Sequence, residues 1–181
     1  MKLIVMGRDG VINHPSEQFI KSPEEWRAIE GSAEAIAQLK QWGWRVVVAT
    51  NQSLIGRGLI GLETVNEIND KMVRALNRVG GRLDAVFFCP HVDDDRCECR
   101  KPKPGMLREI GERFHVDLTS VPVVGHTRAD MDAALAVGAR PFLVRTGYGA
   151  ATFASYEEEG GVPEGVQVCA DLAEVVSVLT D

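Results

Sequence analysis

Short apolar runs that alternate with helix-like segments are the feature that most restricts the fold of this chain. The runs are rich in β-branched residues and lie at residues 2–6, 45–50, 84–88, 121–125, 141–145 and 166–170. Each run is continuously apolar, which is typical of strands covered on both faces in a parallel sheet. Residues 63–79 carry apolar side chains at steps of three and four and are followed by two glycines, which predicts a helix. The other helices are expected at residues 31–42, 104–114, 128–137 and 171–179.

This order of elements predicts an α/β fold, in which one Rossmann-like domain has a parallel central sheet flanked by helices. The chain has 181 residues, 45% of them apolar, which suits one domain with a substantial core, so we assign residues 1–181 to a single domain. Ligands of such sheets bind beyond the carboxyl ends of the strands. Candidate site residues are therefore those that directly follow the apolar runs.

Composition excludes several classes of function. The net charge is −6 and no basic tract stands out, which argues against a nucleic-acid partner. No apolar run approaches the 18 residues of a membrane span, and the N-terminus turns polar too soon for a signal peptide. Three of the four cysteines lie close together beside a histidine, which favours a metal site, and thus a cytoplasmic location, over a disulfide framework.

Polar segments follow four of the predicted strands. They are Gly7-Arg8-Asp9-Gly10, Thr50-Asn51-Gln52-Ser53, Arg100-Lys101 and the stretch from His126 to Asp130. One edge of the sheet thus gathers a carboxylate, hydroxyls with amides, two cations and a glycine-led turn into a helix. Hydroxyls, backbone N–H groups and a lysine bind a phosphate dianion, so we predict a phosphate site here. Ordinary helix-capping loops are the alternative for any one segment.

The segment CPHVDDDRCEC, residues 89–99, is a loop inserted after the third predicted strand. Its spacing is C-x-H-x5-C-x-C, which offers Cys89, His91, Cys97 and Cys99 as ligands. Three thiolates and one imidazole predict a closed tetrahedral zinc site with a structural role. The loop contains an acidic triplet and buries little apolar surface, so a bound metal ion would be needed to hold its conformation. Free thiols in a reducing cell are the alternative.

The segments GRDGVIN, VVVATNQS, CRKPKPGM and VVGHTRADMDAA resemble the four motifs of the haloacid dehalogenase (HAD) superfamily of phosphatases. More narrowly, the chain resembles the branch of the D-glycero-D-manno-heptose 1,7-bisphosphate 7-phosphatases and the related histidinol-phosphatase domain. The resemblance runs from residue 2 to about residue 149. It implies a HAD-type domain. The span of about 40 residues between the first two motifs leaves room only for a minimal cap.

The resemblance also implies roles for individual residues. Asp9 stands at the position of the general acid and base, and Thr50 and Lys101 match the phosphate-binding hydroxyl and lysine. Asp130 matches the distant acidic residue of the fourth motif. The other candidates for binding phosphate or substrate are Asn51, Gln52, Ser53, Arg57 and Arg100. The family carries zinc at the four residues of the inserted loop and Mg²⁺ at the reaction centre, where the cation neutralises phosphate before attack.

Two positions depart from the family pattern. Gly7 stands where the aspartate nucleophile is expected, and His126 stands where an aspartate ligand of Mg²⁺ is expected. Imidazole is a poor ligand for Mg²⁺, which prefers oxygen, so the sequence argues against a magnesium site. We therefore expect a pseudo-phosphatase that has lost phosphoryl transfer and binds a phosphorylated sugar or a partner protein. Two alternatives stay open: an active Mg²⁺-dependent sugar-phosphate phosphatase in a variant or engineered form, and a different activity that uses Asp9 with His126.

Overall fold

Six parallel strands form one sheet in the order β3-β2-β1-β4-β5-β6. The computed structural model describes all residues, 1–181. The strands are β1 (Leu3–Met6), β2 (Arg45–Asn51), β3 (Ala85–Cys89), β4 (Pro122–Gly125), β5 (Arg140–Val144) and β6 (Gln167–Cys169). β1 lies between β2 and β4, with Leu3 paired to Arg45 and Val5 paired to Val123. The strand order reverses there, and such a reversal opens a crevice at the carboxyl edge where ligands bind.

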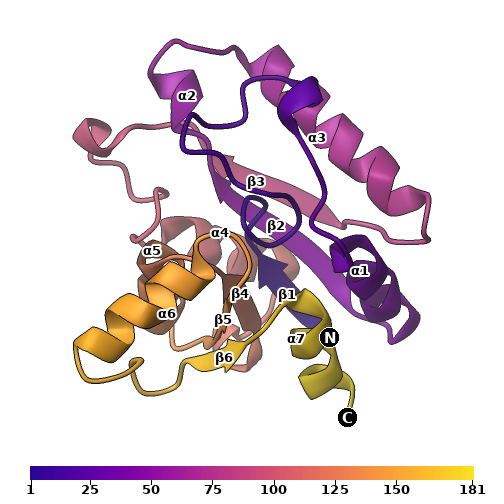
Figure 1. Ribbon diagram of the computed structural model, residues 1–181, viewed down its shortest axis with the longest axis vertical. Coiled ribbons are helices and arrows are strands. Elements are labelled where there is room, and N and C mark those ends of the chain that lie inside the picture. The colour runs from indigo at the N-terminus through magenta and orange to yellow at the C-terminus, as the bar shows by residue number, and fades with distance from the viewer.

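Seven α-helices connect and cover these strands. They are α1 (Ser32–Gln41), α2 (Ser53–Gly56), α3 (Leu62–Asn77), α4 (Gly105–Phe114), α5 (Arg128–Ala136), α6 (Gly149–Glu158) and α7 (Leu172–Thr180). Short 3-10 turns lie at Pro23–Glu25, Asp93–Asp95 and Leu118–Ser120. Figure 1 shows α1, α3 and α7 on one side of the sheet and α4, α5 and α6 on the other. None of these helices is both long and apolar enough to cross a bilayer.

Alternate residues of each strand feed two separate cores. Ile4 and Met6 of β1 pack in the core formed with α1, α3 and α7, whereas Leu3 and Val5 pack in the core formed with α4 and α5. This division follows from the alternation of side chains along a strand. It explains why the strands are apolar at every position, as the sequence predicts, and it confirms the α/β fold with helices on both faces.

The helix α6 corrects one expectation from the sequence, which placed no helix between the last two strands. The structure has a helix at Gly149–Glu158. Its one fully packed large side chain is Tyr156, which is 4% exposed and contacts Met131 of α5 and Leu143 of β5. The guanidinium of Arg128 lies 4.3 Å from the centre of the Tyr156 ring. Tyr156 is thus the main buried contact of this helix. The helix lacks the apolar stripe from which hydrophobic periodicity in a sequence predicts a helix.

The end of α3 corrects a second expectation. The sequence extended this helix to residue 79, but it ends at Asn77, and Val79 is 42% exposed rather than part of the apolar stripe. The chain turns back at Gly80, whose φ of 84° is open to glycine and costly for other residues. The four buried residues of α3 are Val65, Ile68, Met72 and Leu76.

Candidate functional site

A cavity of about 240 Å³ lies at the carboxyl edge of the sheet, where the strand order reverses. It is lined by residues at or after the ends of β1, β2, β4 and β5 and by two cations that directly follow the inserted loop. The residues named from the sequence that line it are Gly7, Asp9, Thr50, Asn51, Gln52, Ser53, Arg100, Lys101, His126 and Asp130. Arg57 does not line this cavity; it is exposed, and its guanidinium lies 5.1 Å from the centre of the Phe19 ring.

Asp9 is held at the cavity by a tight loop after β1. The Nε of Arg8 and the Nδ2 of Asn13 each donate to Asp9 Oδ1 at 2.9 Å. Both hydrogen bonds go to the same oxygen, so Oδ2 of a side chain that is 32% exposed is left for a ligand. Arg8 itself is only 1% exposed, and its Nη1 donates to Asn69 of α3 at 3.2 Å. The sequence places Arg8 in the segment after the first strand but gives no sign of its contact with Asn69, because the two residues are 61 positions apart.

Lys101 is positioned by the end of β2 and by α5. Its Nζ donates to the carbonyl of Ala49 at 3.0 Å and pairs with Asp130 Oδ1 at 2.7 Å. Asn51 holds the lysine backbone, because its Nδ2 donates to Lys101 O at 3.1 Å and its Oδ1 accepts from Lys101 N at 3.2 Å. The ammonium is therefore fixed at the edge of the cavity. It can donate a further hydrogen bond to a phosphate oxygen while it keeps these contacts.

Asp130 lies beneath this lysine. Its Oδ2 accepts from the backbone N–H groups of His126 and Thr127 at 3.0 and 3.1 Å. Burial alone raises the pKa of this carboxyl, but the charge of Lys101 and the hydrogen bonds from Lys101 and the His126 backbone lower it to about 2. Asp130 is thus an anion whose Oδ1 orients Lys101 and whose Oδ2 is used by two backbone N–H groups.

Thr50 presents its hydroxyl beside the lysine at the end of β2. The side chain is 4% exposed, and its Oγ1 accepts from Gln52 Nε2 at 3.0 Å. The Thr50 hydrogen has only the Asn51 carbonyl, at 3.5 Å, as a partner. That contact is too long to be a strong hydrogen bond, so the hydroxyl keeps a donor for an anion in the cavity.

Gly7 continues β1 and donates its N–H to Val124 O at 3.0 Å. A Cβ built at this position meets nothing closer than Val11 Cγ2 at 3.6 Å and the carbonyl of Asp9 at 3.8 Å. These are ordinary van der Waals distances, so the backbone accepts a side chain at position 7. The glycine is therefore not required by the fold.

The Nδ1 atom of His126 takes part in a hydrogen bond and is not free to bind a metal. Its Nδ1 accepts from the backbone N–H of Tyr148 at 3.0 Å, and the two rings are stacked with centres 5.6 Å apart. Burial is the main cause that lowers the pKa of this imidazole, and Lys101 adds to it, against the opposing charges of Asp130 and Asp9. The neutral ring therefore carries its proton on Nε2. Tyr148, which also lines the cavity, was not among the residues named from the sequence.

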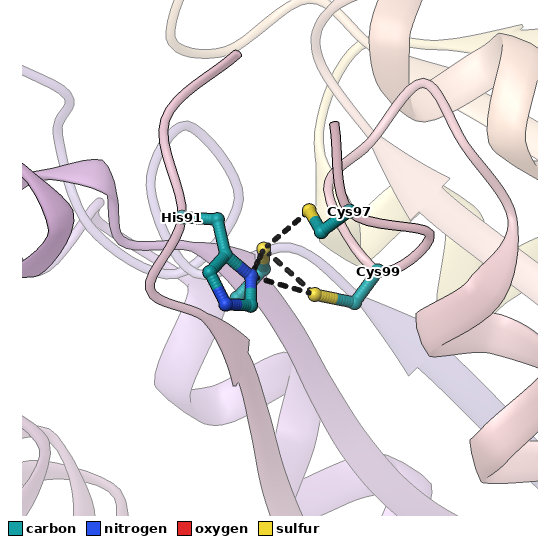
Figure 2. Close-up of side chains that lie close together, drawn as sticks. His91, Cys97 and Cys99 are labelled. Atoms are coloured by element: carbon teal, nitrogen blue, oxygen red, sulfur yellow. Dashed lines mark hydrogen bonds between the residues drawn. The ribbon is translucent and has the colours of Figure 1, made fainter. Parts of the chain in front are cut away.

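The four residues of the inserted loop form a second cluster, in which one ligand atom of each lies within 4.8 Å of the others. Figure 2 shows His91, Cys97 and Cys99 pointing toward one another. Cys89 Sγ lies 3.6 Å from Cys97 Sγ, and His91 Nδ1 lies 3.3 Å from Cys99 Sγ. Ligand atoms about 2.3 Å from a tetrahedral zinc ion are roughly 3.8 Å apart. Cys89 Sγ and Cys99 Sγ are 2.9 Å apart, so the cluster is more compact than a site that holds the ion.

The inserted loop is coupled to the cavity through Arg100. The Nε of Arg100 donates to Asp93 Oδ1 at 2.6 Å, and Nη1 donates to the carbonyl of His91 at 3.4 Å. Both partners belong to the loop, and Arg100 lines the cavity. Arg100 thus joins the inserted loop to the edge of the cavity.

Two family models match the chain. The model described as HAD-hydrolase-like matches residues 98–175, and the model described as polynucleotide kinase 3 phosphatase matches residues 8–127.

Individual relatives match almost the whole chain. A D-glycero-beta-D-manno-heptose-1,7-bisphosphate 7-phosphatase of Bordetella bronchiseptica is 54% identical over 99% of this chain and 98% of its own. One of Pseudomonas putida is 47% identical over 99% of both chains. The crystal structure of the D,D-heptose 1,7-bisphosphate phosphatase from B. bronchiseptica, complexed with magnesium and phosphate, is 54% identical, covers 99% of this chain and 98% of that chain, and has a TM-score of 0.94.

These comparisons correct the expectation of a pseudo-phosphatase. That expectation rested on Gly7 and His126 alone, whereas relatives of up to 54% identity along the full length are heptose-bisphosphate phosphatases. The rest of the site supports the same correction, because Asp9, Thr50, Lys101 and Asp130 converge on one cavity. The prediction gave more weight to two altered positions than to the rest of the motifs. The comparisons favour the alternative of a sugar-phosphate phosphatase.

Proposed function

Since this chain belongs to the heptose 1,7-bisphosphate phosphatase branch of the HAD superfamily, we propose that it hydrolyses a sugar phosphate monoester, the 7-phosphate of a heptose 1,7-bisphosphate. The observation that carries the proposal is the convergence of the Asp9 carboxylate, the Thr50 hydroxyl and the Lys101 ammonium on one cavity. The hydroxyl and the ammonium bind the dianion, and the carboxylate moves a proton. The second phosphate and the sugar remain outside, where the minimal cap leaves the cavity open.

With Gly7 in place, a water molecule takes the part of the nucleophile. The transition state of phosphoryl transfer is loose, so positioning and charge stabilisation supply most of the catalysis. The water oxygen forms a bond to phosphorus while the bond from phosphorus to the sugar oxygen breaks. The Asp9 carboxyl relays a proton from solvent to the leaving sugar oxygen and returns to the carboxylate form, while the attacking water loses a proton to solvent. No covalent phospho-enzyme forms on this route.

Magnesium fits this site only together with substrate. Mg²⁺ in phosphate-processing proteins is held by one or two carboxylates, by substrate phosphate and by water. Asp9 supplies one carboxylate oxygen, whereas Asp130 is occupied by Lys101 and His126 Nδ1 by Tyr148. When bound, the cation neutralises phosphate charge. We expect weak magnesium affinity without phosphate, because a single carboxylate is left for it.

We assign zinc to Cys89, His91, Cys97 and Cys99, on the basis of their mutual distances and donor types. The ion would have no free coordination position for a substrate. Its function would be to hold the loop that presents Arg100 and Lys101. Thiolate ligands require reducing surroundings, so we place the protein in the cytoplasm.

The test measures phosphate release from D-glycero-D-manno-heptose 1,7-bisphosphate with Mg²⁺, for the natural chain and for Asp9→Asn. The variant keeps an oxygen that accepts from Arg8 but cannot supply the proton. We expect measurable release by the natural chain and a loss on the order of 100-fold or more in Asp9→Asn. Absence of release by the natural chain at high protein concentration would exclude the proposed activity.

A further inference from the structure

The segment between β5 and α6 is tied to the cavity by contacts that the catalytic chemistry does not need. Thr146 Oγ1 donates to the carbonyl of Gly10 at 2.7 Å, and the N–H of Tyr148 donates to His126 at 3.0 Å. Gly147 passes so close to Gly10 that a Cβ there would lie 2.5 Å from the Gly10 Cα. The segment is therefore fixed against the loop that carries Asp9.

The His126 ring is the centre of this attachment. It packs directly on Gly10 and Gly147, where any Cβ would overlap it, and it is 7% exposed. Its backbone carbonyl accepts from Thr152 Oγ1 of α6 at 2.8 Å. The ring thus connects β4, the loop after β1 and the start of α6, and its Nδ1 can accept from Tyr148 only while that nitrogen is unprotonated.

These contacts fix the position of Tyr148. Its ring lies over that of His126 at an interplanar angle of 23°, lines the cavity with Asp9 and Lys101, and is 40% exposed. Burial, then the charges of Glu17 and Asp9, raise the pKa of its hydroxyl, so the phenol stays neutral beside a phosphate. One face of the ring is covered by His126, and the side chain still reaches the cavity mouth.

We propose that Tyr148 is the specificity-determining residue for the sugar and that His126 is its positioning residue. This inference rests on the proposed function, because it concerns the part of the same substrate that lies outside the phosphate cavity. A sugar ring has an apolar face of C–H groups, and a rigid aromatic side chain offers a large contact area at low entropic cost. The hydrogen bond from the Tyr148 N–H to His126 Nδ1 holds the tyrosine in place before the sugar arrives.

The experiment compares two probes that share a phosphonate group and cannot be hydrolysed. Methylphosphonate reaches only the phosphate cavity, whereas mannose 6-phosphonate also reaches Tyr148. Dissociation constants are measured by calorimetry for the natural chain, Tyr148→Phe and Tyr148→Ala. We expect Tyr148→Ala to weaken the sugar probe about 10-fold and methylphosphonate less than twofold, with Tyr148→Phe like the natural chain.

His126→Asn and His126→Leu test the positioning role. The Asn oxygen lies near the place of Nδ1 and keeps an acceptor for the Tyr148 N–H, whereas Leu has none. We expect His126→Asn to bind the sugar probe like the natural chain and His126→Leu to follow Tyr148→Ala. If His126→Leu does not fold, His126→Asn and the Tyr148 pair decide the question.

The outcomes separate this inference from the proposed function. Equal weakening of both probes by Tyr148→Ala, or of neither, would overturn the specificity role while leaving the phosphatase proposal intact. A sugar probe that binds the natural chain no more tightly than methylphosphonate would do the same. Failure of methylphosphonate to bind would instead overturn the phosphate site, and this inference with it.

Discussion

At position 7 the side chain that the family pattern places there is missing, because the residue is glycine. The backbone there accepts a Cβ at ordinary contact distances. A carboxylate introduced at this position would stand beside Asp9 and provide both a nucleophile and a second oxygen ligand for Mg²⁺. The rate of hydrolysis is therefore the property that this residue controls, more than the stability of the fold.

We predict that Gly7→Asp raises kcat for phosphate release by at least about 100-fold, since removing a nucleophile typically costs about 10⁴-fold. Gly7→Ala is the matched control, because it fills the same space without a carboxylate. The steady-state rate with Mg²⁺ measures the effect, and acid quenching should trap a phospho-enzyme only in Gly7→Asp. Equal rates for the two variants would show that position 7 is not the limiting defect.

Arg8 is the most buried charged side chain at the site, and it connects Asp9 to Asn69 of α3. Arg8→Lys keeps the charge but loses the planar fork that reaches both partners. We predict a loss of about 1–3 kcal/mol in the free energy of unfolding, because hydrogen bonds to a charged group are broken in a buried place.

Urea unfolding measures the effect of Arg8→Lys, with the exposed Arg78→Lys as a control that should change stability by less than about 0.5 kcal/mol. A similar loss in both variants would contradict the role of the Arg8 contacts. Activity should also fall in Arg8→Lys, since Asp9 loses one of its two hydrogen bonds.

The inserted loop after β3 helps to position a residue of the cavity. It carries the Cys and His cluster, and Arg100 attaches the cluster to the cavity. We predict one zinc ion per chain by elemental analysis, and loss of that zinc in Cys97→Ser. Cys169→Ala is the control, because Cys169 is buried in the other core and lies outside the cluster.

Loss of zinc should also weaken phosphate binding, because Arg100, whose two partners belong to the loop, is no longer held at the cavity. The expected change is an increase of roughly 10-fold in the dissociation constant of inorganic phosphate, the effect of one charge-assisted contact of about 1.4 kcal/mol. Unchanged phosphate affinity in Cys97→Ser would show that the two sites are independent.

The helix α3 tests the packing of the larger core. Ile68 is fully buried between α3 and the sheet, whereas Leu62 at the start of the same helix is 52% exposed. We predict that Ile68→Ala costs about 2–5 kcal/mol of unfolding free energy through lost burial and the cavity it leaves. Leu62→Ala should cost less than about 1 kcal/mol by the same urea measurement. Comparable losses would mean that the helix is not docked as described.

For the molecule as a whole, the buried imidazole of His126 links stability to pH. Burial lowers the pKa of His126 in the folded chain, whereas its pKa in the unfolded chain is about 6.5. Below that pH the unfolded state binds a proton that the native state does not, so stability must fall as the pH falls until the folded pKa is passed.

We predict that the free energy of unfolding decreases between pH 7 and pH 5 by up to about 1.4 kcal/mol per pH unit more in the natural chain than in His126→Asn. Urea titrations at pH 7, 6 and 5 give the two slopes. Because the other three histidines are present in both proteins, their contributions cancel in the comparison. Parallel slopes would show that His126 is not held neutral in the folded state.

The architecture of this protein can be derived from its amino-acid sequence. Continuous apolar runs separated by amphipathic segments admit a parallel sheet covered on both faces, and the polar residues after the runs then meet at one edge. The spacing of Cys89, His91, Cys97 and Cys99 likewise indicated their cluster, because the four lie in one short loop. Such features are local in the chain, or follow from the topology, and need no knowledge of side-chain packing.

The arrangement of the altered site, in contrast, depends on contacts between distant segments of the chain. Pairing of Arg8 with Asn69, stacking of Tyr148 on His126 and docking of α6 through Tyr156 all join segments that are distant in sequence. Reading Gly7 and His126 from the motifs alone led to the wrong conclusion about function. A motif states which side chains are missing, whereas the effect of a missing side chain depends on the charges and contacts that the fold brings around it.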